Sequence, residues 1–341
     1  MSDPLQDRTY LHERHRLSHQ QIDRWLGENR SKEFMREKMQ RMETVKHFIS
    51  ITDRLRENHI DFVCLKGPML SFRIYGDASV RISHDVDILI QMVDLIPAIN
   101  LMKEEGYVMP NEIDWPTDKL RQNLMIKSSQ HINLLNKNLG FSVELHWTII
   151  HSLSLTPEKV QELLKSNLTI VAFAGREFSV MNKEFELLFL MIHGARHEWN
   201  RLKWLMDIND YPLEDFDQNH FLELVNIFRA EQIIGQTNYF LKRYFNRQTP
   251  LPGGIKPAIY MIRHAQRAIN GELYPASSTL MDILCIYKYR MLLFPGFSYK
   301  FKIIGEVSIT QTDVTQQKFS NKLTYYLYRP YSFIKRRVLH A

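Results

Sequence analysis

Two aspartates one residue apart, Asp85 and Asp87, are the side chains in this sequence whose spacing most directly suggests chemistry. They alternate with the apolar, β-branched residues Val86, Ile88 and Ile90, and this pattern predicts a β-strand. Because side chains alternate along a strand, the two carboxylates should share one face. They would repel each other and resist burial there, and a divalent cation would remove both costs. The run therefore predicts a metal site suited to phosphoryl or nucleotidyl transfer.

A glycine turn upstream is a candidate phosphate site. Residues 62–65 form a short apolar run, Gly67 breaks it, and Pro68 suits the first position of a helix that should end near Gly76. Free backbone N–H groups at the start of that helix would bind an anion, and the glycine would allow close approach. Lys66 would add a positive charge. The turn is a weak signal alone and a stronger one beside the two aspartates.

A later alternating stretch supplies a possible third acid. Within residues 141–147, Glu144 and His146 fall on the polar face of a predicted strand. If this strand lies beside the aspartate strand, Glu144 completes a triad of acids able to hold two divalent ions about 3.5–4 Å apart. The alternative is a solvated carboxylate. His146 could contact a nucleotide or an acceptor, or it could be an ordinary polar-face histidine.

Arg81 and Ser83 precede the aspartates and are candidate nucleotide-binding residues. Ser83 should share the strand face of Asp85, so it could hydrogen-bond a ligand carboxylate, or it could simply begin the strand. Arg81 could neutralise phosphate charge, or it could pair with Asp77.

The order of these features resembles the polymerase-β-like nucleotidyltransferase superfamily. The shared order is a strand, a Lys-Gly turn, a helix, an Arg-x-Ser-x-Asp-x-Asp strand and a later strand carrying Glu. The sequence is most similar to a bacterial branch of uncharacterised nucleotidyltransferases and to the related abortive-infection toxin enzymes. The resemblance covers residues 45–210, which include the expected catalytic module and the beginning of the next region of the chain.

By this resemblance Asp85, Asp87 and Glu144 are catalytic metal ligands, and Lys66 and Gly67 contact nucleotide phosphates. The implied cofactor is Mg²⁺, as two ions, and the implied substrate is a nucleoside triphosphate. The enzyme would transfer a nucleoside monophosphate to a hydroxyl-bearing acceptor and release pyrophosphate. The chain departs from the family pattern where proline, which has no N–H to donate, comes after the glycine.

The sequence leaves the acceptor open, since a small molecule, tRNA or protein would each fit. Two other functions also stay open. The chain could be a non-catalytic nucleotide- or partner-binding module that kept the fold. It could also be a toxin-like enzyme that modifies tRNA or protein.

A second group of candidates lies after the module. His193 and His197 are four residues apart on a predicted helix, which is a zinc-ligand spacing, but no third ligand is evident, and packing between domains is the favoured interpretation. By the family resemblance, this segment lines an interdomain cleft. Arg201 and Lys203 could then bind phosphates or substrate, and Asp207 could orient one of them. A salt-bridge cluster at a helix end is the alternative.

The composition is that of a globular cytoplasmic protein. The 341 residues are 44% hydrophobic and 24% charged, no stretch reaches the about 20 apolar residues that span a bilayer, and the polar N-terminus lacks a signal-peptide core. The two cysteines, Cys64 and Cys285, are too few for a disulfide framework or a zinc site. Cys64 lies in an apolar strand and should be a buried free thiol.

The predicted fold class is α+β: a small mixed sheet with helices, of the nucleotidyltransferase type. Three parts are expected, namely an N-terminal helical segment (1–58), a catalytic core (59–155) and a mainly helical C-terminal domain (156–341). Residues 18–58 should be helical throughout. A hairpin is expected around Gly175, after the catalytic core.

The C-terminal tail is strongly basic. From Leu284 onwards there are ten basic and two acidic residues, a net charge of +8 against +6 for the whole chain, and several tyrosines lie among them. Such a tail could contact nucleic acid, an anionic surface or an acidic partner. A helix with aromatic residues packed inward and lysines outward is the preferred alternative.

Overall fold

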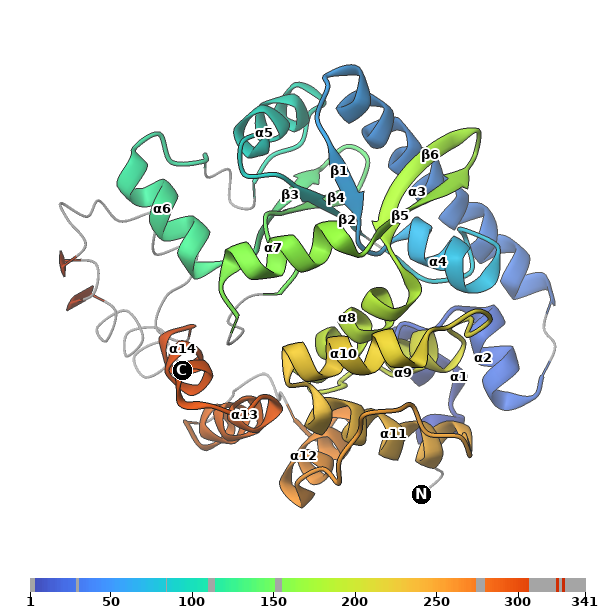
Figure 1. Cartoon of the computed structure of the whole chain (residues 1–341). Coiled ribbons are helices and arrows are strands. Elements are labelled where there is room, and N and C mark those ends of the chain that lie inside the picture. Colours follow the sequence, from blue (N-terminus) through green and yellow to red (C-terminus); the bar gives the residue numbers. More distant parts are fainter. Residues whose placement is uncertain are drawn as a thin grey trace.

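A computed structural model describes residues 4–28, 31–83, 85–109, 114–150, 155–273, 280–306, 323–324 and 327–328. Within them a six-stranded mixed sheet packs against helices, which confirms the predicted α+β class (Figure 1). The strands are β1 (Phe62–Cys64), β2 (Asp85–Ile90), β3 (His131–Asn136), β4 (Phe141–His146), β5 (Leu168–Phe173) and β6 (Arg176–Met181).

The helices before β5 flank the sheet or precede it. They are η1 (Pro4–Gln6), α1 (Arg8–Glu13), α2 (His19–Leu26), α3 (Ser31–Glu57), α4 (Pro68–Tyr75), α5 (Leu95–Glu104), α6 (Lys119–Ser128) and α7 (Pro157–Ser166). The later helices form the lower layer in Figure 1. They are α8 (Lys183–Arg196), α9 (Leu202–Asn209), α10 (Gln218–Phe228), α11 (Glu231–Phe245), α12 (Ile259–Ile269), α13 (Leu280–Leu293) and α14 (Phe297–Glu306). Among the described helices, none combines the length and apolar character that crossing a membrane requires.

The strand order is β3-β4-β2-β1-β6-β5. Strand β2 pairs antiparallel with β1 and parallel with β4, so it lies at the centre of the sheet. The β5–β6 hairpin forms as predicted, but it does not stand alone. Strand β6 pairs parallel with β1 through Cys64 and Val180, and the sheet therefore continues past the expected boundary at residue 155.

The two faces of the sheet belong to two different hydrophobic cores. Val86, Ile88 and Ile90 pack with α3, α5 and α6, whereas Leu89 packs with the core of the later helices. This division confirms the predicted alternation along β2. The face that carries Asp85 and Asp87 is therefore turned toward the later helices. Cys64 is a buried free thiol, as predicted, and burial raises its pKa.

The N-terminal region is helical but not continuous. Helix α2 ends at Gly27, whose positive φ of 69° is the left-handed conformation that commonly closes a helix, and α3 begins at Ser31. The uninterrupted helix expected over residues 18–58 is therefore wrong at this point, because glycine ended it. Leu11, Leu17 and Ile22 are buried in the core of the C-terminal helices, far along the chain.

Most of the basic tail lies outside the described residues, so most of its predicted contacts are not described. Among its described aromatic residues, Tyr289 in α13 and Tyr299 in α14 are buried. Two of its basic residues fall within α13. Lys288 Nζ lies 4.4 Å from the centre of the Tyr260 ring, and Arg290 Nε lies 3.5 Å from Glu198 Oε1. These two cations pack against the chain itself.

Candidate active site

The acids of β2 and β4 lie side by side. In the parallel pairing of the two strands, Asp85 is opposite Ser142 and Asp87 is opposite Glu144. The strand that carries Glu144 therefore lies beside the strand that carries the two aspartates. The predicted cluster of three acids depended on this pairing. Asp87 is only 3% exposed, while Asp85 and Glu144 are half-buried. Three carboxylates thus line one face of the sheet.

Two basic side chains offset the buried charge of Asp87. Lys66 Nζ lies 2.8 Å from Asp87 Oδ1, and His146 Nε2 lies 3.2 Å from both Asp87 Oδ1 and Glu144 Oε2. Burial alone would raise the pKa of Asp87, but the Lys66 ammonium and His146 outweigh it and hold that pKa well below its usual range. Asp87 is therefore an anion in a buried position. His146, on the face of Glu144 as expected, links two of the acids.

The glycine turn has the geometry that the sequence predicted. Gly67 caps α4 with φ 73° and ψ −145°, a conformation that glycine tolerates best, and Pro68 occupies the first turn of the helix, which ends at Gly76. A Cβ on Gly67 would lie 3.4 Å from the backbone oxygen of Asp85 and 3.9 Å from Ser83 Oγ. The turn therefore passes directly over the start of β2, with the open helix N-terminus beside the acids.

Ser83 closes this turn from the other side. Its hydroxyl donates to the backbone oxygen of Asp85 at 2.8 Å and lies 3.4 Å from Asp85 Oδ1. The shorter bond is to the backbone of Asp85, so the role expected of Ser83 toward the carboxylate stays a prediction. Ser83 is itself 7% exposed, so it is largely shielded from water.

Arg81 pairs with a residue of the helical layer. Its Nε lies 3.0 and 2.9 Å from the two carboxylate oxygens of Asp207 in α9, and both side chains are buried. The suggested pair with Asp77 is wrong, because Asp77 instead bonds Lys38 and Ser79. Asp207 was expected to orient Arg201 or Lys203, and its hydrogen-bonded partner is Arg81. The pair fastens the segment before β2 to α9.

Helix α9 brings further positive charge toward the acids. Lys203 is half-buried and interacts electrostatically with Arg81, Asp85 and Asp207. Burial and the neighbouring Arg81 lower the pKa of Lys203 to about 7. Arg201, the residue before the helix, also interacts with Asp85. The cations of α9 therefore lie near the carboxylates of β2.

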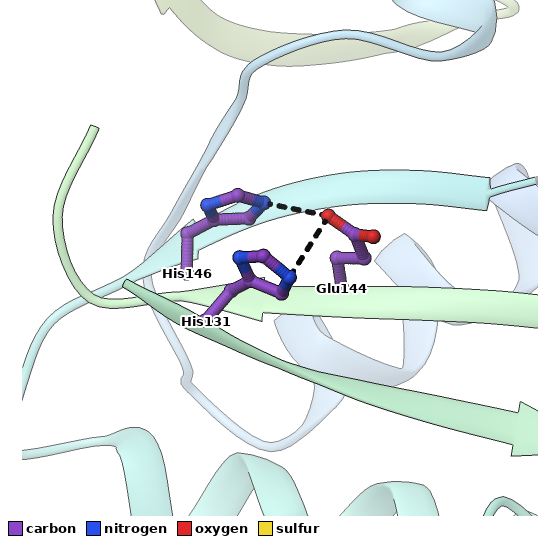
Figure 2. Close-up of side chains that lie close together, drawn as sticks. All are labelled: His131, Glu144 and His146. Carbon is purple, nitrogen blue, oxygen red and sulfur yellow. Dashed lines mark hydrogen bonds and ion pairs between the residues drawn. The ribbon is translucent and has the colours of Figure 1, made fainter. Parts of the chain in front are cut away.

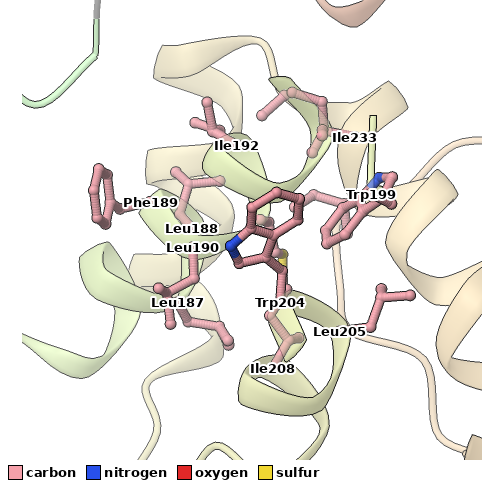
Figure 3. Close-up of a cluster of buried hydrophobic side chains, with 14 of the residues drawn as sticks. Leu187, Leu188, Phe189, Leu190, Ile192, Trp199, Trp204, Leu205, Ile208 and Ile233 are labelled. Atoms are coloured by element: carbon pink, nitrogen blue, oxygen red, sulfur yellow. The ribbon is translucent and has the colours of Figure 1, made fainter. Parts of the chain in front are cut away.

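His193 and His197 lie at the C-terminal end of α8 and line a small cavity together. Their ring centres are 4.6 Å apart, and the His197 ring stacks on Trp204 at 5.1 Å. Trp204 belongs to the apolar cluster of the helical layer (Figure 3). Burial lowers the pKa of His193 well below its usual value, and the nearby Lys66 lowers it further. His193 is half-buried and His197 is exposed, so packing of this pair between the domains stays a prediction.

Asp85, Asp87 and Glu144 line neither of two nearby cavities. A small one of about 100 Å³ is lined by His193, His197, Arg196 and Arg290. A larger one of about 500 Å³ lies between the sheet and α7, where Leu89 lines it. The larger lining is mostly apolar, so it is poorly suited to a polyanion. The basic residues around the acids are the better setting for phosphates.

His131 is the residue of this site that the sequence analysis missed. It stands opposite His146 in the antiparallel β3–β4 pair, and its Nε2 lies 3.6 Å from Glu144 Oε2 (Figure 2). Burial lowers its pKa to about 4, and His146 contributes to that shift, so the ring is neutral at pH 7. Residues 136–140, just before the predicted strand of Glu144, have the composition of a hairpin turn, and following the register of that hairpin would have found His131.

The donor set fits divalent metal. Asp85, Asp87 and Glu144 supply carboxylate oxygens, the donors that Mg²⁺ prefers. Within the described part of the chain, one group of three or more candidate ligands has all its donor atoms within 4.8 Å of one another: His131, Glu144 and His146. Asp85 and Asp87 are outside that group. Asp87 instead contacts Lys66 and His146.

Comparison with known proteins agrees with this geometry. The model of a family described as "uncharacterised nucleotidyltransferase" matches residues 14–246, which contain the sheet, the acids and α9. A search of curated proteins found no match. The match spans more than half of the chain and includes the acids, the glycine turn and the α9 cations. The chain therefore belongs to this nucleotidyltransferase family, and its reaction class is nucleotidyl transfer.

Proposed function

We propose that the chain is a metal-dependent enzyme that transfers a nucleoside monophosphate from a nucleoside triphosphate to a hydroxyl group and releases pyrophosphate. The observation that carries this proposal is the register of β2 and β4, which places Asp87 opposite Glu144 beside the Gly67 turn. Carboxylates next to a phosphate-binding turn are the arrangement that this chemistry needs.

Asp85, Asp87 and Glu144 would hold Mg²⁺, as two ions. Bound there, the metal would neutralise phosphate charge and make the acceptor hydroxyl more acidic. Lys66 is already 2.8 Å from Asp87, so it stands where it can move between that carboxylate and a phosphate oxygen. The open N-terminus of α4 offers its free N–H groups to the same anion, although Pro68 supplies none.

The α9 side of the cleft would bind the far end of the triphosphate. Lys203 and Arg201 are the cations that face Asp85 from this helix. The Arg81–Asp207 pair would hold the β2 side and the α9 side of the cleft in fixed positions, because it joins the segment before β2 to α9. The half-buried His193 and the exposed His197 would line the cleft.

In the reaction, the acceptor oxygen forms a bond to the α-phosphorus as the bond from that phosphorus to the β-phosphate oxygen breaks. Pyrophosphate leaves with the electron pair of the broken bond. Glu144 would receive the hydroxyl proton, since its side chain is 18% exposed while that of Asp87 is 3% exposed. Most of the rate enhancement would come from positioning and from charge neutralisation.

The test is to incubate the protein with each α-labelled nucleoside triphosphate, Mg²⁺ and cell extract, and to find which molecule acquires label. We expect one class of acceptor, whether small molecule, tRNA or protein, to be labelled and pyrophosphate to appear with it. Calorimetric titration of a triphosphate with and without Mg²⁺ is the companion measurement. Metal-independent binding without transfer would instead identify a non-catalytic nucleotide-binding module.

A further inference from the structure

The β3–β4 hairpin gathers two imidazoles around one carboxylate. His131 is opposite His146 in the antiparallel register, and Asn133 is opposite Glu144. Because residues two apart share a strand face, His131, Glu144 and His146 all project from the face that carries Asp87. Figure 2 shows both rings directed at the Glu144 carboxylate. The backbone pairing itself therefore sets the spacing of these three side chains.

The distances within this cluster suit a bound metal ion. His146 Nε2 and His131 Nε2 lie 3.2 and 3.6 Å from the same oxygen, Glu144 Oε2. Donors on a tetrahedral metal with bonds of about 2.0–2.1 Å are about 3.4 Å apart. The two measured separations lie on either side of that value. The third pair of donor atoms is within 4.8 Å, so a small rotation of the rings would close the site.

One of the two contacts between an imidazole and Glu144 is a hydrogen bond. The 3.2 Å contact of His146 with Glu144 is a hydrogen bond, but the 3.6 Å contact of His131 is too long for one. His146 is 3% exposed, and its Nδ1 has no hydrogen-bond partner among the described residues. A cation between the two Nε2 atoms and the carboxylate would join all three groups.

We propose that His131, Glu144 and His146 form a binding site for a first-row transition-metal ion of the Zn²⁺ class. Two imidazole nitrogens and one carboxylate favour such ions, whereas Mg²⁺ favours oxygen donors alone. The inference extends the proposed function, because Glu144 is also one of its acids. One of the two ions of the site is then held partly by nitrogen, and the other by the oxygens of Asp85 and Asp87.

The test uses the untagged full chain after removal of metal by a chelator. Co²⁺ and Zn²⁺ are titrated separately and followed by the visible absorption of bound Co²⁺ and by calorimetry, in the presence of excess Mg²⁺. We expect one ion to bind despite the Mg²⁺. His131→Asn should weaken binding by at least about tenfold. The matched control is His59→Asn, at an exposed loop histidine with φ 54°, a conformation that asparagine tolerates, and it should bind as the wild type does.

A second measurement needs no variant. X-ray absorption of the Zn²⁺-loaded wild-type protein should show imidazole nitrogen among the ligands, and a shell of oxygen alone would overturn the proposal. Unchanged affinity in His131→Asn, or no retained ion in the wild type, would overturn it as well. Failure of nucleotidyl transfer by a protein with an imidazole-ligated ion would count against the proposed function and leave this site standing. Nucleotidyl transfer by a protein whose bound metal has only oxygen ligands would support the proposed function and overturn this site.

Discussion

The two faces of β2 are both buried, but they differ in how burial is made favourable. Val86, Ile88 and Ile90 are at most 1% exposed and pack against α3, α5 and α6, so one face gains stability by removing apolar surface from water. On the other face, Asp87 is 3% exposed and charged. Its burial depends on Lys66 and His146, since an unpaired buried carboxylate would be costly.

Along this single strand, one face therefore contributes stability and the other carries the groups proposed for the chemistry. The apolar face can be filled by any side chains of suitable shape. The acidic face requires particular groups at particular positions, and it contributes little stability beyond offsetting its own desolvation. Substitutions on the two faces should therefore have different consequences.

The largest effect is expected for Asp87→Asn. The substitution keeps the shape of the side chain but removes the charge that would hold the metal, so transfer should fall by at least about 10³-fold. Label transfer measures the activity, and circular dichroism checks that the variant is folded. A folded Asp87→Asn protein that still transfers nucleotide at the wild-type rate would remove the basis of the proposed function.

The opposite face should respond in the opposite way. Ile88→Ala would leave a cavity in the core shared with α3 and α5 and should lower the free energy of unfolding by about 2–5 kcal/mol. Activity per folded molecule should stay within about twofold of wild type, because no atom of the site is removed. Urea unfolding measures the stability. If Ile88→Ala abolished transfer while unfolding stayed unchanged, the division between the faces would be incorrect.

Gly67→Ala tests the glycine turn that lies over the start of β2. Alanine strains the backbone at φ 73°, and its Cβ would enter the space over the start of β2, so triphosphate binding should weaken by about tenfold. Gly140→Ala is the control, since Gly140 also has a positive φ of 63° but a Cβ there would meet nothing within 4 Å. Both variants should lose about 1 kcal/mol of stability, and only Gly67→Ala should lose triphosphate affinity in calorimetry.

The smallest effect concerns pH. The pKa of Lys203 is lowered to about 7, and a bound phosphate would raise it again, so binding takes up a proton. Triphosphate affinity should therefore decline by several fold as the pH rises from about 6 to about 8.5, through the pKa of the free protein. Lys203→Arg, which stays charged, should flatten this dependence. Equal pH dependence in the two proteins would show that Lys203 does not contact the triphosphate.

Much of the catalytic module could be predicted from local pattern. The alternation around Asp85 and Asp87 fixed which side chains share a face, and Gly67, Pro68 and Gly76 marked both ends of α4. The family resemblance, which rested on the same residues, agrees with the family model that matches the chain. These features were readable because they depend on backbone conformation over only a few residues.

Contacts between distant segments could not be read in this way. Arg81 and Asp207 are 126 residues apart along the chain. They form an ion pair because α9, which carries Asp207, packs close to the segment before β2. His131 joined the site only through the register of the β3–β4 hairpin.

The sequence by itself determined the strand that carries the acids, the glycine turn beside it and the class of reaction they suit, because alternation and turn formation are local properties of the chain. Only the tertiary structure decided which groups surround those acids: Lys66 and His146 on Asp87, His131 near Glu144, and the α9 cations near Asp85. The physical reason is that strand pairing and helix packing are chosen by the burial of whole faces, and no local pattern specifies which faces meet.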